Sequence, residues 1–288
     1  MKKTILLFSL IILVSCQDVV DVDVPTEEPR LVVEALIRVD PTKQTTPVAI
    51  KVTTTSGFFG QPQPARLNNI YLSVEGTTGT ITLFEIPAGS GIYQPSADEV
   101  TPIEISTLYF TDNEKHVLTI DFEDKIFLAF SGYYRSTPLD NLAQGRENLF
   151  DEDETEIITT FTDRPDEENF YVLDYSGDGF LPTEDTFYRD QQFTFSYFYE
   201  KPLNPGDILT VSILGSDRSF YNYMNQLIEQ SDDEPNPFQT PTNTVRGNII
   251  DATDIDNIDN FDNVNLPNNF ALGYFAISEV FTRTLTIE

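Results

Sequence analysis

The sequence predicts an all-β protein that carries one amphipathic helix. Phe and Tyr are abundant, with 22 and 13 among 288 residues, and aromatic residues together with Thr, Val and Ile favour strands. Short segments of alternating apolar and polar residues are separated by turns that contain Gly or Pro. After the first thirty residues, only one stretch repeats apolar residues at helical spacing.

The amino terminus has the pattern of a secretory signal. Lys2 and Lys3 precede an apolar run over 5–14, which is roughly half as long as a membrane-spanning helix. The tetrad Leu13-Val14-Ser15-Cys16 resembles the lipobox of bacterial lipoproteins. This resemblance implies that residues 1–15 are removed as a signal peptide and that Cys16, the only cysteine, is acylated. A plain secretory signal or a short membrane anchor are the alternatives.

Residues 16–30 form an acidic segment that we expect to be a tether. Pro25 and Pro29 interrupt it, and five of its residues are Asp or Glu. Acidic residues just after an acylated cysteine resemble the export signal of surface lipoproteins in Bacteroidota. The resemblance implies an outer-membrane location that faces the cell exterior. The inner leaflet of the outer membrane, or an ordinary solvated linker, are the alternatives.

Composition argues against several classes of function. The net charge is −30, the wrong sign for nucleic-acid binding. With one His, and with Cys16 acylated, a histidine-cluster metal site, a Ser-His-Asp triad and a Cys-His pair are difficult to build. We therefore expect no enzyme. A hydrolase using paired carboxylates stays possible, although 47 acidic residues place some carboxylates close together by chance.

Regularly spaced strands over residues 31–125 predict an N-terminal β-sandwich of immunoglobulin-like or transthyretin-like type. His116 follows a polar run and is expected to be a surface turn residue. The expected strands lie at 31–37, 48–55, 70–74, 81–84, 103–110 and 117–122.

Residues 126–288 are expected to form a C-terminal β-rich domain with a helix at about 219–230. Ser216 or Ser219 could cap the start of this helix. Its single apolar stripe is made of Phe220, Tyr223, Met224, Leu227 and Ile228. Residues 138–153 are expected to be a loop. Residues 126–134 are apolar and aromatic and are expected to begin this half. The expected strands lie at 156–162, 170–175, 193–199, 208–214 and 245–250, with a closing hairpin of 272–278 and 282–287.

The strand at 193–199 has one wholly aromatic face, made of Phe193, Phe195, Tyr197 and Tyr199. Such a face usually packs into a core, although a stacking platform for sugars is the alternative. Gly247 and Gly273, each inside a strand pattern, indicate bulges or close backbone approach.

A short acidic motif begins like a calcium loop. Asp174, Ser176 and Asp178 stand at positions 1, 3 and 5, Gly179 at position 6 and Asp185 at position 12. Asp185 is shorter than the usual Glu and the flanks resemble strands, so a Gly-Asp-Gly hairpin turn is the alternative. The Asp251–Asn263 segment could bind divalent cations loosely or contact a basic partner, or it could be a solvated insertion.

Five segments together resemble one family. The chain is similar to a domain-of-unknown-function family of Bacteroidota outer-membrane lipoproteins, which are typically encoded beside TonB-dependent receptors. It differs from the usual pattern of this family in its long acidic segment after Ile250 and in the region 134–153. The resemblance implies no catalytic residues. The segments are Pro29–Glu34, Asn169–Tyr171, Phe220–Tyr223, Arg246–Ile249 and Leu272–Phe275.

The expected function is therefore a lipid-anchored, non-catalytic binding or accessory subunit of a TonB-dependent nutrient-uptake receptor. The receptor and the outer membrane are the expected partners, and calcium is the one cofactor considered. A structural or adhesive surface protein is the first alternative, and a hydrolase is the second.

Overall fold

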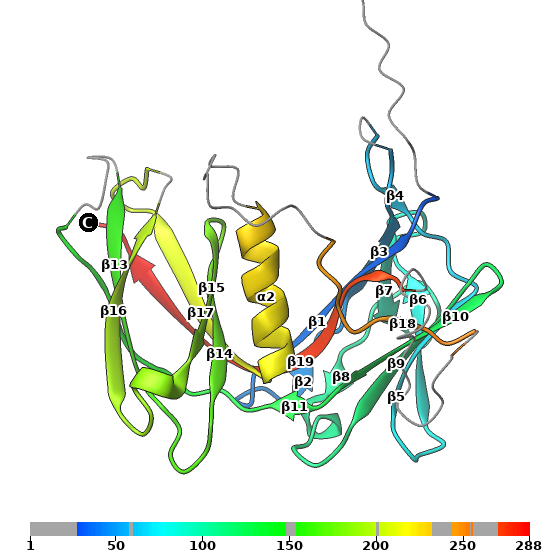
Figure 1. The fold of residues 1–288 in the computed structure, drawn as a ribbon, viewed down its shortest axis with the longest axis horizontal. Helices are drawn as coiled ribbons and strands as arrows, with labels where there is room; N and C mark the ends of the chain where they lie inside the picture. The colour runs from blue at the N-terminus through cyan, green and yellow to red at the C-terminus, as the bar shows by residue number, and fades with distance from the viewer. Residues whose placement is uncertain are drawn as a thin grey trace, which may run out of the picture.

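The computed structural model describes residues 28–57, 60–147, 154–199, 202–231, 244–253, 255 and 270–288 (Figure 1). Predictions for the signal peptide, Cys16, most of the tether and most of the Asp251–Asn263 segment concern residues outside this part. The described part is mainly β and carries one α-helix, so the predicted all-β class is confirmed.

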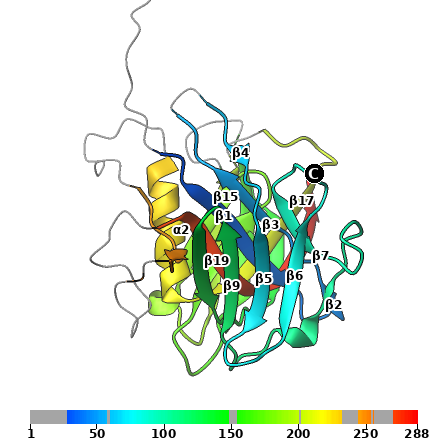
Figure 2. The ribbon, with the colours of Figure 1, turned by 90° about the vertical axis from the view of Figure 1, so that its right-hand side faces the viewer.

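The N-terminal half is built mainly from one large sheet that curls around a hydrophobic core (Figures 1 and 2). Its strand order is β19-β1-β3-β7-β6-β5-β9-β10-β18, and β11 pairs with β19, so the sheet returns to its first strand. This arrangement differs from the expected sandwich of two facing sheets. The bounds are β1 Leu31–Val39, β2 Thr45–Thr46, β3 Ile50–Thr54, β4 Gln63–Pro64, β5 Asn69–Val74, β6 Thr80–Glu85, β7 Ile92–Pro95, β8 Ile105–Ser106, the 3-10 helix η1 Thr107–Tyr109, β9 His116–Phe122, β10 Lys125–Ser131, β11 Tyr133–Tyr134, β18 Ile250–Asp251 and β19 Leu272–Thr286.

The C-terminal half is a two-layer sandwich that shares a strand with the first half. One layer, β15-β14-β17-β19, continues the large sheet, and the other layer is β12-β13-β16. A second core of aromatic and aliphatic residues lies between the layers. The bounds are β12 Leu139–Gln144, β13 Thr155–Thr162, β14 Phe170–Tyr175, β15 Gly179–Glu184, the 3-10 helix η2 Asp185–Phe187, β16 Gln192–Tyr199, β17 Ile208–Ser216 and helix α2 Arg218–Ser231.

Strand β1 lies near the centre of the large sheet. It pairs parallel with β19, from Val32 opposite Leu272 to Val39 opposite Glu279, and antiparallel with β3. Its odd-numbered residues are buried in the first core, whereas its even-numbered residues face the side of α2 and are more exposed. The period of two therefore gives the strand a core face and a second face that α2 only partly covers.

Helix α2 confirms the helix predicted at about 219–230. Its start is capped by Asp217, whose Oδ1 accepts a hydrogen bond of 2.8 Å from the amide of Phe220, and not by Ser216 or Ser219. The helix lies beside the large sheet (Figure 1), and Phe220 and Met224 belong to a third core cluster with residues of β14, β17 and β19. No helix in the described residues is long and apolar enough to cross a membrane.

The predicted closing hairpin is wrong, because β19 is one strand of 15 residues. Glu279 interrupts the apolar pattern, but it is buried inside the strand, where it accepts hydrogen bonds from Tyr133 Oη at 2.6 Å and from Arg135 at 3.3 Å. Three further strand predictions differ from the structure. Residues 103–110 hold only β8 and η1, the predicted loop at 138–153 contains β12, and the strand at 245–250 shrinks to β18.

The predicted boundary between residues 125 and 126 falls inside the β9–β10 hairpin. β10 pairs with β9 along its whole length, from Lys125 opposite Phe122 to Ser131 opposite His116. Tyr133 belongs to the first core and Leu139 to the second, so the chain first passes from one core to the other between these two residues. It later returns to the first core with Ile249, Ala271, Phe275 and Ile277.

His116 is fully buried, contrary to the surface position expected for it. It begins β9, between Val74 of β5 and Ser131 of β10, so strands flank it on both sides. Its Nε2 lies 3.1 Å from the carbonyl oxygen of Tyr109, while its Nδ1 has no hydrogen-bond partner among the described residues. Burial lowers the pKa of His116, against a weaker opposing effect of the Tyr109 carbonyl.

We expect His116→Gln to reduce the loss of stability in mild acid. The unfolded chain takes up a proton on this imidazole near pH 6.5, before the folded chain does, because the folded pKa is lower. Stability from this site is therefore present above pH 6.5 and falls by up to about 1.4 kcal/mol per pH unit below it. Urea unfolding of both proteins from pH 8 to 5 measures the effect. Stability curves that stay parallel over this range would contradict it.

Candidate functional site

An open apolar groove lies between helix α2 and the face of the large sheet formed by β1, β3 and β19. Its volume is about 780 Å³. The start of β15 contributes Phe180, and the residues just before β18 contribute Val245. Six apolar residues that line it are Val32, Leu36, Phe180, Met224, Leu227 and Leu272.

Two ion pairs place charge within the groove. Lys51 Nζ lies 2.8 Å from Glu34 Oε1, and both side chains are more than half exposed, so this pair adds little stability. The Arg38 guanidinium lies 2.6 Å from Asp174 Oδ2, and the side chain of Asp174 is only 14% exposed. The groove therefore combines an apolar lining with cationic and anionic groups at fixed positions.

Two glycines allow the backbone beside the groove to pack closely. Gly273, which lines the groove, has φ +94°, and a Cβ there would overlap the carbonyl oxygen of Val33 on β1. A Cβ on Gly247 would overlap the carbonyl oxygen of Gly273. The close backbone approach predicted for both glycines is confirmed.

Asn248 joins β10 to β19 through its side chain. Its Nδ2 donates to the carbonyl oxygens of Phe275 at 2.8 Å and Phe130 at 3.1 Å, and its Oδ1 accepts from the amide of Phe275 at 2.8 Å. The amide group thus takes the place of a paired strand residue. Arg246 lies directly before this Gly-Asn pair, with its guanidinium over the ring of Phe270 at 4.7 Å.

The four predicted calcium ligands do not converge on one point. Ser176 and Asp178 lie in the turn of the β14–β15 hairpin, where Tyr175 pairs with Gly179. Asp185 follows β15 at the opposite end of the hairpin, roughly 20 Å away for a strand of six residues. The segment is therefore the hairpin turn that was the alternative to a calcium loop, and β14 and β15 are the strands that flank it.

Each acidic member of that motif is held by another protein group. Asp174 pairs with Arg38 in the groove, and Asp178 accepts a hydrogen bond of 3.1 Å from Tyr197 Oη. Asp185 is fully buried and accepts from Arg189 Nε at 3.0 Å and from the amide of Asn169 at 3.0 Å. The described residues contain no cluster of three or more His, Cys, Asp or Glu side chains suited to a metal.

The aromatic face of β16 packs into the second core, as the more common interpretation predicted. Tyr197 stacks on Tyr175 with ring centroids 3.7 Å apart, and Phe193 stacks on Tyr188 at 4.5 Å. Phe195 also packs against this core. These rings hold the two layers of the sandwich together.

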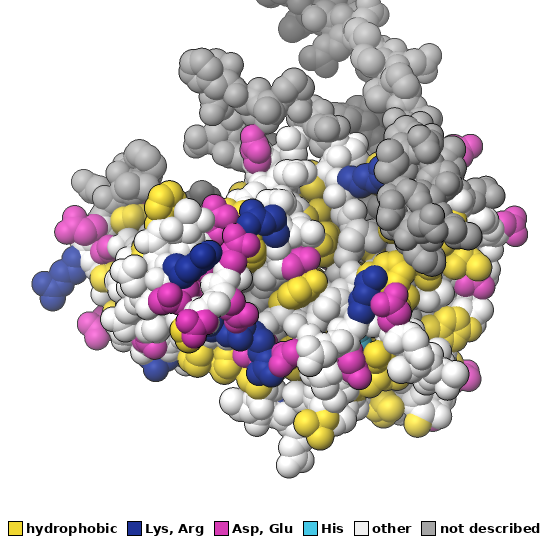
Figure 3. Space-filling model, turned by 60° about the horizontal axis from the view of Figure 1, so that its bottom comes forward, with side chains coloured by type: hydrophobic (Ala, Val, Ile, Leu, Met, Phe, Trp, Pro, Cys, Tyr) yellow, Lys and Arg dark blue, Asp and Glu magenta, His cyan; other side chains and the backbone are white. Residues whose placement is uncertain are grey.

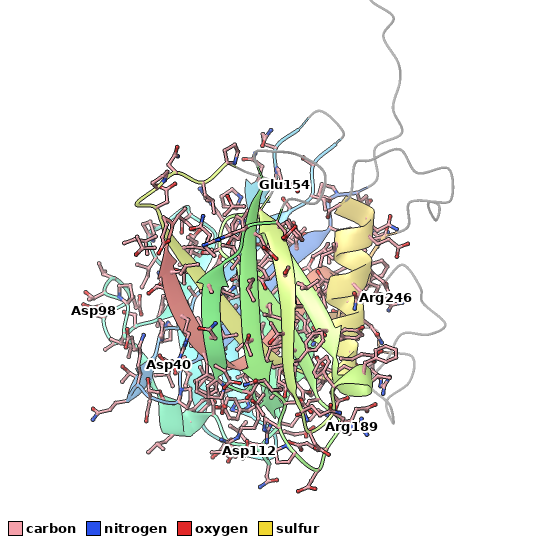
Figure 4. The ribbon with its side chains drawn as sticks, turned by 90° about the vertical axis from the view of Figure 1, so that its left-hand side faces the viewer. Asp40, Asp98, Asp112, Glu154, Arg189 and Arg246 are labelled. Atoms are coloured by element: carbon pink, nitrogen blue, oxygen red, sulfur yellow. The ribbon has the colours of Figure 1, made fainter. Side chains whose placement is uncertain are left out.

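Basic side chains of the described part are interspersed with acidic ones on the underside of the molecule (Figure 3). Asp112 and Arg189 lie at this end of the fold (Figure 4). The Arg135 side chain pairs with Asp112, and this hydrogen-bonded ion pair lowers the pKa of the carboxyl group. Arg218 pairs in the same way with Glu168 at 2.6 Å. Arg135 and Arg218 thus each have a carboxylate partner.

Sequence reasoning missed the groove because its residues are far apart in the chain. Leu36, Phe180 and Leu227 come from a strand, a hairpin and a helix that meet only in the folded protein. One signal was present in the sequence: the even-numbered residues of β1 include Glu34 and Arg38, which mark its second face as less buried.

The fold and the groove define an all-β protein with an open, ligand-sized groove beside its α-helix. The sequence matches the family model described as "Domain of unknown function (DUF4249)" over residues 17–284, and the chain belongs to this family. A comparison with curated proteins found no match. The resemblance to a family of unknown function is thereby confirmed.

Proposed function

We propose that this protein is an outer-membrane lipoprotein, anchored through Cys16 and facing the cell exterior. In this proposal it binds a ligand without catalysis and serves as an accessory subunit of a TonB-dependent nutrient-uptake receptor. The apolar groove is the observation that carries the binding role. The lipobox and the acidic tether support the anchor, and the resemblance to receptor-associated lipoproteins supports the partner.

The groove favours an amphipathic small molecule as the ligand. Its volume of about 780 Å³ falls within the usual range of small-molecule sites, which are mostly apolar with a few placed polar groups. Met224 has a flexible side chain that can adapt to the shape of a ligand. Arg38 and Lys51 can orient a polar head group, while the apolar part of the ligand contacts Leu36 and Leu227.

We expect Leu227→Glu to weaken binding of the apolar fluorophore N-phenyl-1-naphthylamine by about tenfold or more. The new carboxylate would have to be desolvated against the bound apolar molecule. Ile228→Glu is the matched control, because Ile228 is 37% exposed against 38% for Leu227, lies on the same helix and is not among the lining residues. Fluorescence titration measures both variants, and equal weakening in both would refute the groove as the site.

The anchor and the receptor are tested on the protein from its own membrane. Mass spectrometry is expected to show a mature chain that begins with acylated Cys16. Gentle solubilisation of outer membranes is expected to co-purify a TonB-dependent receptor with the lipoprotein. Failure to recover a receptor in several detergents would contradict the partnership, and surface binding that persists after deletion of the receptor gene would favour the adhesive alternative.

A further inference from the structure

Strand β16 is an open edge of the three-stranded sheet β12-β13-β16. All eight of its residues pair with β13 on one side, from Gln192 opposite Thr162 to Tyr199 opposite Thr155. No strand in the described part of the chain pairs with its other side. In an antiparallel ladder, alternate residues direct their N–H and C=O groups to each side, so about half of β16 presents backbone donors and acceptors to the open side.

The other long edges carry features that block pairing with a further strand. β12 has a register shift between Leu139 and Asn141, with the exposed Asp140 in between. β15 contains Pro182 and Glu184. Bulges, prolines and charges are the usual means by which proteins protect a sheet edge.

β16 has none of these protective features. Its sequence, Gln-Phe-Thr-Phe-Ser-Tyr-Phe-Tyr, contains no charged residue, no Pro and no Gly. Gln192, Thr194 and Ser196 are exposed on its outer face, and the aromatic side chains of its inner face pack against the second core. A long uncharged edge in a chain with net charge −30 is therefore a specific feature of this surface.

We propose that β16 receives an extended segment of a partner protein, which adds a fourth strand to the sheet. Main-chain hydrogen bonds would supply the affinity, and alternate apolar residues of the partner would continue the inner aromatic layer. The acidic body favours a segment without acidic residues and with basic flanks. This interaction surface is separate from the groove, so one face can hold a partner while the other holds a ligand.

A second copy of this chain is a poor occupant for the edge. Antiparallel pairing of β16 with itself requires a two-fold axis perpendicular to the sheet, which reverses the strand direction of the second copy. β16 runs along the vertical direction of Figure 1, and β1 begins at the upper end of the molecule. The two amino termini would then point in opposite directions, and one tether would have to run back along the whole molecule to reach the same membrane. This disfavours the dimer and rests on the proposed lipid anchor.

The test uses a fluorescent peptide, acetyl-Lys-Lys-Thr-Phe-Thr-Phe-Thr-Tyr-Thr-Lys-Lys-amide, and fluorescence anisotropy. Thr194→Lys places a charge on the open edge and is expected to weaken binding about tenfold or more. Asn141→Lys is the matched control. Asn141 of β12 and Thr194 of β16 both lie opposite Thr160 of the central strand β13, so the two lysines stand at equivalent positions on the two edges of the sheet. This control is expected to bind like the wild type, and melting temperatures verify that both variants are folded.

A second arm tests the main-chain contacts. The same peptide with alternate amides N-methylated is expected not to bind, because it cannot complete the ladder. The proposal would be overturned if Thr194→Lys and Asn141→Lys bound the peptide equally well, or if the methylated peptide bound as tightly as the unmethylated one. It would also be overturned if sedimentation showed a wild-type dimer that Thr194→Lys dissociates. Leu227→Glu is expected to bind the peptide normally, so failure of the groove and failure of the edge are distinguishable.

Discussion

Gly273→Ala is expected to lower the free energy of unfolding by about 3 kcal/mol or more. The φ of +94° is unfavourable for an L-residue, and the added Cβ would overlap the backbone carbonyl of Val33. This carbonyl belongs to β1, the strand that pairs with β19 along eight residues, so it cannot move without breaking that ladder. Urea denaturation followed by circular dichroism measures the loss.

Gly206→Ala separates the two causes. Gly206 has the same φ of +94°, but a Cβ there would meet no atom within 4 Å. We expect this control to show the conformational cost alone, about 1 kcal/mol. Equal destabilisation by the two variants would show that the contact with β1 is unimportant.

Asn248→Ala is expected to destabilise the protein by about 3 kcal/mol. The substitution removes three hydrogen bonds and leaves the amide of Phe275, and the carbonyls of Phe275 and Phe130, without this partner. Each bond contributes about 1 kcal/mol in the net. Asn248→Asp is expected to be as damaging, because it keeps the acceptor but directs a carboxylate oxygen at two carbonyls.

The control for this position is Asn225→Ala on helix α2. Asn225 is exposed and donates only to the carbonyl of Tyr221, one turn earlier. Its loss is expected to change the free energy of unfolding by less than about 0.5 kcal/mol. An Asn248→Ala variant that unfolds at the same urea concentration as Asn225→Ala would contradict the role of Asn248 as the link between β10 and β19.

Local patterns predicted most of the individual elements. The alternation in β1, β5, β9 and β16 follows from one more buried face per strand, and the helical stripe of Phe220 and Met224 follows from packing on the sheet. Gly247 and Gly273 were recognised from their places inside strand patterns, because only close backbone contact explains glycine there.

Two of the errors concern polar residues that distant parts of the chain enclose. Glu279 looked like a turn residue, but Tyr133 and Arg135 accompany it into the protein interior. His116 looked exposed after a charged run, but strands on both sides enclose it. The calcium motif counted positions along a loop, whereas the hairpin ladder carries Asp185 away from Asp178.

The position of β1 between β19 and β3 also determines how the fold bears mechanical load. An anchor at Cys16 would transmit any drag on the body to the first residue of this interior strand. Tension directed along β1 shears its two flanking ladders, so many backbone bonds share the force and must break together. A strand at the rim would instead peel away one bond at a time, and the placement of β1 therefore suits a protein that is held by its amino end.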